Sequence, residues 1–328
     1  MTNTDNEAMW IDRTGWTWIP MRGADRVDLL NRLSTNDLTQ LQAGKGLQTV
    51  LTTDKARIID VLMVLNDADR SMMLASPGMG PKILQWLRTY TITDDVRLVD
   101  ATSLVEMIEV TGARAADVVK SVTGINVALF TIGEWIATSI GEQDLYVFRM
   151  PPTLELSYWL VGNPDVIRAI KSALAEVPGL EEPLTDAEIE YLRVMRGIGA
   201  SAHEWTDAYN PLEAGLLHLT SFTKGCYIGQ EIIARLDSYN KVKQRILGFV
   251  SDTELHVGDV IAPINDDASA SNTAIGALTT VTRGRNSKSW YALGYIRGEH
   301  AHPGTSVEIR TANETGRAVV QLLPMVDA

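Results

Sequence analysis

The chain changes character at about Arg245, and this change limits the folds open to it more than any other feature. Beyond that point the apolar residues alternate in short runs typical of strands, at residues 246–251, 275–283, 290–296, 306–310 and 318–322. Short strands that follow one another without helices must pair with each other to bury their apolar faces. We therefore expect a small antiparallel β-barrel or sandwich at this end.

Upstream of Arg245, helical and strand patterns are mixed. Helical periodicity covers residues 22–37, 81–90, 113–122 and 164–176, and strand patterns cover residues 47–53, 58–65, 96–99, 104–110, 134–140 and 144–148. Residues 177–183 resemble a linker, and Thr185 with Glu188 forms a capping-box pattern for a helix that ends near Arg196. The order contains no regular βαβ repeat, which favours α+β packing.

Length and charge limit the classes of function. A chain of 328 residues is too long for one comfortable core, so two or three domains are expected. The formal net charge of -12 argues against a general nucleic-acid binder, because neutralising phosphates needs a supply of Lys and Arg. The five histidines do not gather into a ligand set, so no metal site is expected.

The cysteine count and the length of the apolar runs indicate in which cellular compartment the protein is expected. The single cysteine, Cys226, excludes an internal disulfide and a four-cysteine cluster site built from this chain alone. Residues 1–8 are polar and acidic and lack the pattern of a secretory signal, and no apolar run approaches the roughly 20 residues of a membrane helix. We expect a cytoplasmic protein with no membrane partner.

The segment that surrounds the cysteine carries the strongest signal. Residues 222–235 read F-T-K-G-C-Y-I-G-Q-E-I-I-A-R, in which two glycines permit tight backbone turns before a helix at about residues 228–236. A thiol near a helix N-terminus and beside Lys224 can have its thiolate stabilised. The alternative is that Cys226 is a small buried core residue, which is the commoner fate of a free cysteine.

Residues 224–231 resemble the K-G-C-Y-x-G-Q-E signature of YgfZ-type proteins, the iron–sulfur maintenance branch of the aminomethyltransferase superfamily. The resemblance extends to L-S-T-N-D at residues 33–37 and to N-P-L-E-A-G-L at residues 210–216. It implies a three-lobed α+β fold with a C-terminal antiparallel β-barrel. The implied lobes are residues 1–100 with 180–240 for folate binding, residues 101–179, and residues 241–328 for the barrel.

The same resemblance implies a function and its partners. A YgfZ-type protein binds tetrahydrofolate or a one-carbon derivative and supports the assembly or repair of iron–sulfur proteins, so those proteins or their assembly factors are the implied partners. The alternative is a folate-dependent aminomethyl or methyl transferase of the glycine-cleavage type. A third possibility is a purely structural partner protein without folate affinity. Whether the chain is an enzyme stays open.

Asp60 is the first candidate for the folate site. It interrupts the apolar run of residues 58–64, and a buried carboxylate is costly without a partner. In aminomethyltransferases this strand carries an acidic residue that faces the reactive nitrogens of the folate, and the resemblance gives that role to Asp60, with Cys226 at the pocket rim. The alternative is an aspartate on the solvent face of the strand. The second acidic residue of many aminomethyltransferases is missing here, as is the segment with their pterin-binding glutamate, which argues against aminomethyl transfer.

The resemblance assigns further binding residues. Arg193 lies where the superfamily has an arginine for the carboxylate end of folate, and the alternative is a salt bridge with Glu188 or Glu190. The remaining candidates for cofactor binding are Glu213, Lys224, Tyr227 and Gln230. Positive charge is also concentrated at Lys224, Arg235, Lys241, Lys243 and Arg245, which suits the polyglutamate tail of a cellular folate or forms a solvated cationic face.

Overall fold

The computed structural model describes residues 8–141, 143–239, 241–264, 273–284, 288–311 and 315–325. The chain forms two compact units, each made of segments distant in sequence. Unit 1 comprises Met1–Leu51, Asp60–Thr185 and Thr223–Ile228, and unit 2 comprises Thr52–Ile59, Asp186–Phe222 and Gly229–Ala328. The division into three lobes at residues 100, 180 and 240 stays a prediction.

The first sheet of unit 1 has the strand order β3-β4-β5-β2-β6. The expected hairpin is present, because β3 and β4 are neighbours in this sheet. The helices expected after residue 22 and after residue 81 are α1 and α2, which contact β5 and β2 respectively. The elements are β2 (Thr17–Arg22), α1 (Arg26–Leu33), β3 (Lys45–Thr52), β4 (Ile58–Asn66), β5 (Arg70–Ala75), α2 (Gly80–Tyr90) and β6 (Arg97–Leu98).

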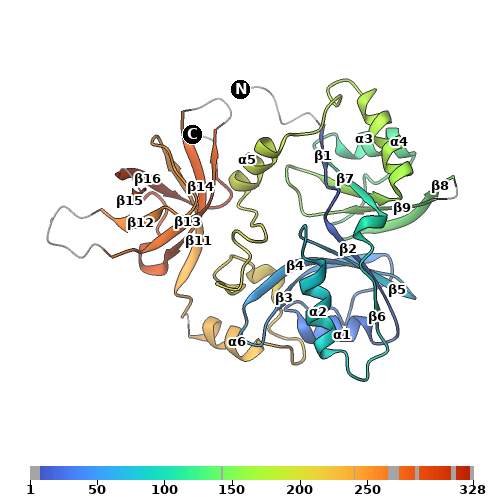
Figure 1. Ribbon diagram of the computed structural model, residues 1–328, viewed down its shortest axis with the longest axis horizontal. Helices are drawn as coiled ribbons and strands as arrows, with labels where there is room; N and C mark the ends of the chain where they lie inside the picture. The colour runs from blue at the N-terminus through green and yellow to red at the C-terminus, as the bar shows by residue number, and fades with distance from the viewer. Residues whose placement is uncertain are drawn as a thin grey trace. The chain divides into compact units, whose positions relative to one another are not determined.

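The second sheet of unit 1 has the strand order β1-β7-β10-β9-β8, and all its strand pairs are antiparallel. Helices α3 and α4 lie together on one face of this sheet (Figure 1). The elements are β1 (Ala8–Asp12), a 3-10 turn (Thr102–Leu104), β7 (Glu106–Gly112), α3 (Ala115–Thr123), β8 (Trp135–Ile140), β9 (Gln143–Arg149), β10 (Ser157–Gly162) and α4 (Pro164–Ala175).

The two sheets of unit 1 share a core that is rich in aromatic and methionine side chains. Met63 and Leu65 of β4 pack in one cluster with Met107 of β7 and Trp159 of β10. Because side chains alternate across a strand, Asp60 lies on the face of β4 opposite to Met63 and Leu65. All nine residues of β4 are buried, so both faces of this strand are covered.

Unit 2 contains the predicted barrel. Six antiparallel strands close in the order β11-β14-β13-β12-β15-β16 (Figure 1), which confirms the expectation for the C-terminal end. The strand pattern missed only β12, which is four residues long. The strands are β11 (Gln244–Ser251), β12 (Val260–Pro263), β13 (Gly276–Arg283), β14 (Trp290–Arg297), β15 (Ser306–Arg310) and β16 (Thr315–Gln321).

Two helices of unit 2 precede the barrel in sequence. The capping-box pattern correctly predicted α5 (Asp186–Arg196), and α6 (Gln230–Ser238) starts two residues later than expected. Short 3-10 turns occur at Leu217–Leu219 and Gly298–His300. In the described part of the chain, no helix has the length and apolar character needed to cross a membrane.

Candidate functional site

The carboxyl group of Asp60 is fully buried, and Ser76 donates a hydrogen bond to each of its two oxygens. Ser76, which follows β5, donates its main-chain N–H to Oδ2 at 2.8 Å and its hydroxyl to Oδ1 at 2.7 Å. Burial raises the pKa of Asp60 to about 6, although the bonds from Ser76 and from the Val61 main chain and the charge of Lys82 oppose the rise. Asp60 is therefore an interior group that can exchange a proton near neutral pH, and not a residue of the solvent face.

Ser76 belongs to a longer chain of hydrogen bonds. Its carbonyl oxygen accepts from the hydroxyl of Thr17 at 2.8 Å, and the hydroxyl of Thr17 accepts from the main-chain N–H of Gly80 at 3.2 Å. Gly80 is the first residue of α2, so this chain connects Asp60 to a helix N-terminus. Every polar group in it has a partner, which fixes the orientation of the Asp60 carboxyl.

Lys224 is buried, and its ammonium group donates hydrogen bonds to main-chain carbonyl oxygens of unit 1. Nζ donates to the carbonyl oxygens of Asn31 at 2.6 Å, Ser34 at 2.9 Å and Asn36 at 2.6 Å. Burial lowers the pKa of Lys224 to about 8, and the charge of Asp37 opposes this change. The contact joins the cysteine segment to the L-S-T-N-D segment, which is distant from it in sequence.

The two residues after Lys224 are exposed, and the third is buried. Cys226 is exposed, and Tyr227 is buried with its ring centroid 4.9 Å from Nζ of Lys224. Burial raises the pKa of the Tyr227 hydroxyl to about 12. The alternative of a buried core cysteine is wrong, since Cys226 is exposed. In the described part of the chain, no hydrogen bond joins Cys226 to Asp60.

Gly229 is the second glycine of the cysteine segment, and its backbone conformation and close contacts require a glycine there. Its φ is +80°, and a Cβ there would lie 2.9 Å from the carbonyl oxygen of Thr53 and 3.0 Å from the Cα of Ala56. Only glycine fits this backbone without strain. Gln230 follows as the first residue of α6, four residues after Cys226.

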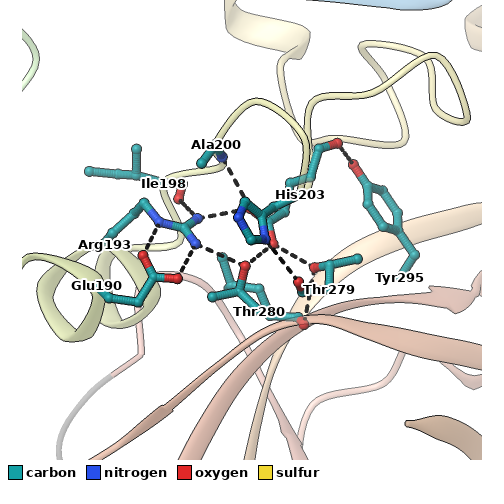
Figure 2. A network of polar contacts seen from close by, with 10 residues as sticks. Glu190, Arg193, Ile198, Ala200, His203, Thr279, Thr280 and Tyr295 are labelled. Carbon is teal, nitrogen blue, oxygen red and sulfur yellow. Dashed lines mark hydrogen bonds and ion pairs between the residues drawn. The ribbon is translucent and has the colours of Figure 1, made fainter. Parts of the chain in front are cut away.

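Arg193 of α5 lies in a polar network of unit 2. The guanidinium donates to both carboxyl oxygens of Glu190 at 3.0 and 2.7 Å, to the carbonyl oxygen of Ile198 at 2.7 Å, to Glu204 at 2.8 Å and to the hydroxyl of Thr280 at 2.8 Å (Figure 2). These five bonds use all five N–H donors of the side chain. A folate carboxylate would have to displace a protein partner, and the ion pair with Glu190 is the alternative that the sequence had offered.

Glu204 is the fully buried acceptor at the centre of this network. Its carboxylate also accepts from the main-chain N–H of Ala200 at 3.0 Å, from the hydroxyl of Thr279 at 2.5 Å and from the hydroxyl of Thr280 at 2.6 Å. Its carbonyl oxygen accepts from the hydroxyl of Tyr295 at 2.8 Å. The network therefore ties α5 and the loop after it to β13 and β14 of the barrel (Figure 2).

Glu213 lies with its carboxyl group buried in unit 2. It accepts from the main-chain N–H of Asn210 at 3.1 Å and stands 3.7 Å from the guanidinium of Arg57. Burial raises the pKa of Glu213. Hydrogen bonds from Asn210 and Gln244 and the positive charges of Arg57 and Lys243 oppose this rise. The predicted site residues thus fall into two groups, with Asp60, Lys224, Cys226 and Tyr227 in unit 1 and Arg193, Glu213 and Gln230 in unit 2.

Several buried polar groups were not predicted from the sequence. Ser76 was one, and its only signal was its place at the end of the apolar strand before a Pro-Gly turn. Another was Glu109, fully buried in β7, which accepts from Arg13 at 2.6 Å and from Ser157 at 2.6 Å. Over the described residues, no three or more His, Cys, Asp or Glu side chains stand close enough to hold a metal ion.

Comparisons with known proteins match both parts of the chain. Residues 1–224 match the GCVT N-terminal domain, and residues 244–327 match the glycine cleavage T-protein C-terminal barrel domain. A protein of Arabidopsis thaliana named as a putative chloroplastic transferase is 28% identical over 315 residues, which cover 93% of this chain and 69% of the relative. An aminomethyltransferase of Phocaeicola vulgatus is 21% identical over 96% of this chain and 86% of its own length.

A solved structure shares the fold. The glycine cleavage system aminomethyltransferase T from Bartonella henselae superposes with a TM-score of 0.86 at 21% identity, over 98% of this chain and 87% of that chain. The predicted fold class, α+β of the aminomethyltransferase type with a C-terminal antiparallel barrel, is confirmed.

Proposed function

We propose, from the premise that this chain belongs to the aminomethyltransferase superfamily defined by the glycine cleavage T-protein domains, that it binds tetrahydrofolate or a one-carbon derivative of it. The observation that carries the proposal is the buried Asp60 carboxyl in the domain that matches the family model. Reduced folates carry one-carbon units on ring nitrogens, which a nearby acid can hydrogen-bond or protonate. A group whose pKa is raised to about 6 suits that task near neutral pH.

Asp60 suits such a ligand for two reasons: hydrogen bonds fix the orientation of its carboxyl group, and burial raises the pKa of that group. Ser76 holds both carboxyl oxygens, so the side chain cannot turn away from a bound ring. In its protonated form the carboxyl donates a hydrogen bond, and in its ionised form it accepts one. We therefore assign Asp60 to the folate ring, and we leave Arg193 out of the first contacts, because its donors are already used by the protein.

We further propose that the protein supports iron–sulfur enzymes, in the manner of the YgfZ-type branch that residues 224–231 resemble. The support is the exposed thiol of Cys226 within that segment. One thiol cannot hold a cluster, but after losing its proton it can supply one ligand to iron in a complex with a partner that supplies the others. Iron–sulfur proteins or their assembly factors are the proposed partners, and the cytoplasm is the proposed compartment.

A second candidate function is folate-dependent aminomethyl or methyl transfer. It is favoured by the names of the relatives, which include aminomethyltransferases that match nearly the whole chain. It requires a carbon donor, such as the aminomethyl group on a lipoyl carrier protein, to pass its one-carbon unit to tetrahydrofolate. Under this function Asp60 retains its role and Cys226 has none.

The two candidate functions predict different activities for the variants Cys226→Ser and Asp60→Ala. In cells that lack the protein, the first predicts low specific activity of iron–sulfur enzymes, restored by the parent chain and not by Cys226→Ser or Asp60→Ala. The second predicts release of ammonia from an aminomethylated lipoyl carrier protein with purified chain and tetrahydrofolate, at the same rate for Cys226→Ser. Full restoration of iron–sulfur enzymes by Cys226→Ser would reject the proposed role of the thiol.

A further inference from the structure

Three main-chain carbonyl groups converge on the ammonium of Lys224. The last carbonyl groups of a helix have no partner within the helix, and Asn31 and Ser34 supply two such groups at the end of α1. The third comes from Asn36, in the loop that follows. An ammonium has three N–H donors and the helix C-terminus favours positive charge, so the group matches its surroundings in number and in sign.

The same end of α1 holds the segment at a second point. The main-chain N–H of Ile228 donates to the carbonyl oxygen of Arg32 at 2.9 Å. Between the two points, Tyr227 is buried and its ring contacts the Lys224 ammonium, while Gly225 and Cys226 are exposed. The exposed thiol therefore lies on a short arch, residues 225–226, whose two ends are fixed to one helix terminus.

We propose that Lys224 is a positioning residue, whose ammonium clamps residues 224–228 onto the C-terminal end of α1 and so fixes where the Cys226 thiol is displayed. The value of this clamp rests on the proposed function of that thiol. The aliphatic stem alone is insufficient, because an apolar side chain of the same length would take a donor away from three carbonyl oxygens, of which those of Asn31 and Ser34 lie in buried contacts and that of Asn36 in a partly buried one. The ammonium also faces the carboxylate of Asp37, which is charged, and the neutral ring of Tyr227.

The clamp predicts a specific chemical rescue. Lys224→Ala removes the last three methylene groups and the ammonium, and n-propylammonium has the size and the three N–H donors to refill that space. Tetramethylammonium carries the same charge without an N–H donor, so it should not replace the side chain. Lys224→Met keeps most of the stem and removes the charge. Lys241→Met is the matched control, because Lys241 is exposed, its ammonium lies over the ring of Tyr239, and its main-chain bond to the carbonyl oxygen of Leu236 is retained in the variant.

Two measurements test whether residues 225–226 are held in place. Hydrogen exchange of the Ile228 amide measures opening at the second fixed point. The rate constant of alkylation by iodoacetamide measures display of the thiol, and because the chain has one cysteine the signal comes from Cys226 alone. Loss of hydrogen bonds from a charged donor should speed Ile228 exchange by roughly tenfold or more in Lys224→Ala and Lys224→Met, and change the alkylation rate in both.

We expect n-propylammonium to restore both readouts in Lys224→Ala, tetramethylammonium to restore neither, and Lys241→Met to match the parent. If Lys224→Ala unfolds, recovery of its folded population by n-propylammonium alone is the same result. Unchanged exchange in Lys224→Met, equal recovery with the two cations, or no recovery with either would overturn the clamp. Neither readout involves folate or iron, so a failed clamp and a failed function are told apart.

Discussion

Both carboxyl oxygens of Asp60 accept hydrogen bonds from Ser76, one from its main-chain N–H at 2.8 Å and one from its hydroxyl at 2.7 Å. The pair lies in the interior of unit 1, where water does not reach the carboxyl group. Burial favours the protonated form and Ser76 favours the ionised form. The balance between the two effects gives the candidate site an acid with a pKa close to neutral.

The raised pKa of Asp60 makes a prediction about stability and pH. Folding raises this pKa from 3.8 to about 6, so the folded state binds more protons than the unfolded state in that window. The contribution of Asp60 to stability is therefore present below about pH 4 and is lost as the pH rises through 6. Asp60→Asn does not titrate, so its stability relative to the parent should increase by up to about 3 kcal/mol between pH 4 and pH 7.

Urea unfolding of both proteins over this pH range measures the difference between their free energies of unfolding. Titratable groups that the two proteins share contribute equally to both values and cancel in the difference. Asp54→Asn is the control for loss of a carboxylate, because Asp54 is exposed. A difference for Asp60→Asn that does not change with pH, or that changes no more than the difference for Asp54→Asn, would contradict the raised pKa.

Ser76 should be coupled to Asp60 in a double-mutant cycle. Ser76→Ala removes the hydroxyl bond and leaves the main-chain bond, so we expect a loss of about 1–3 kcal/mol in the free energy of unfolding at neutral pH. In the Asp60→Ala background the same change should cost at least about 1 kcal/mol less. Additive effects of the two substitutions would show that the hydroxyl acts elsewhere.

Much of the fold was predictable because local patterns agree with the tertiary structure. The capping box at residues 185–188 gave α5, and the alternation after Arg245 gave five of the barrel strands. Outside the barrel, strands β1, β2, β5 and β10 were missed. Pro20 interrupts the pattern of β2, although the residue pairs with Met72 of β5, and its carbonyl oxygen accepts from Val99. Tertiary pairing outweighed the local signal there.

The candidate site was predictable by residue type and not by partner. Asp60 was found because a carboxylate in an apolar strand needs an explanation, but the sequence did not single out Ser76 as its donor. Lys224 was predicted to bind the cofactor or to belong to a solvated cationic face, whereas its ammonium donates to carbonyl groups 188 to 193 residues away in sequence. Main-chain acceptors leave no trace in residue identity, so contacts of this kind come only from coordinates.

Arg193 should be essential for the stability of unit 2. Removing a guanidinium that pairs with the fully buried Glu204 leaves an uncompensated interior charge, so Arg193→Met should cost about 3–5 kcal/mol in the free energy of unfolding. Arg193→Lys should also destabilise, since one ammonium cannot replace the five donors. Arg235→Met, at an exposed position of α6, serves as the control in the same thermal unfolding measurement. A stable Arg193→Met protein with weakened folate binding would instead support a ligand role.

The two glycines of the cysteine segment should differ in their tolerance. Gly229→Ala places a methyl group against Thr53 and Ala56 at a φ of +80°, so we expect a loss of at least about 1–3 kcal/mol in the free energy of unfolding. Gly225→Ala should be close to neutral, because no atom lies within 4 Å of the added Cβ. Denaturant midpoints of the two variants provide the comparison, and equal losses would contradict the packing described for Gly229.

Calorimetric titration of the purified chain with tetrahydrofolate, with the parent compared to Asp60→Ala and to the exposed-site control Asp54→Ala, tests the central claim most directly. We predict saturable binding by the parent and by Asp54→Ala, and a loss of about tenfold or more in affinity for Asp60→Ala, as expected when a buried acid that contacts the ligand is removed. Equal affinity in all three proteins, or no binding by the parent, would contradict the account.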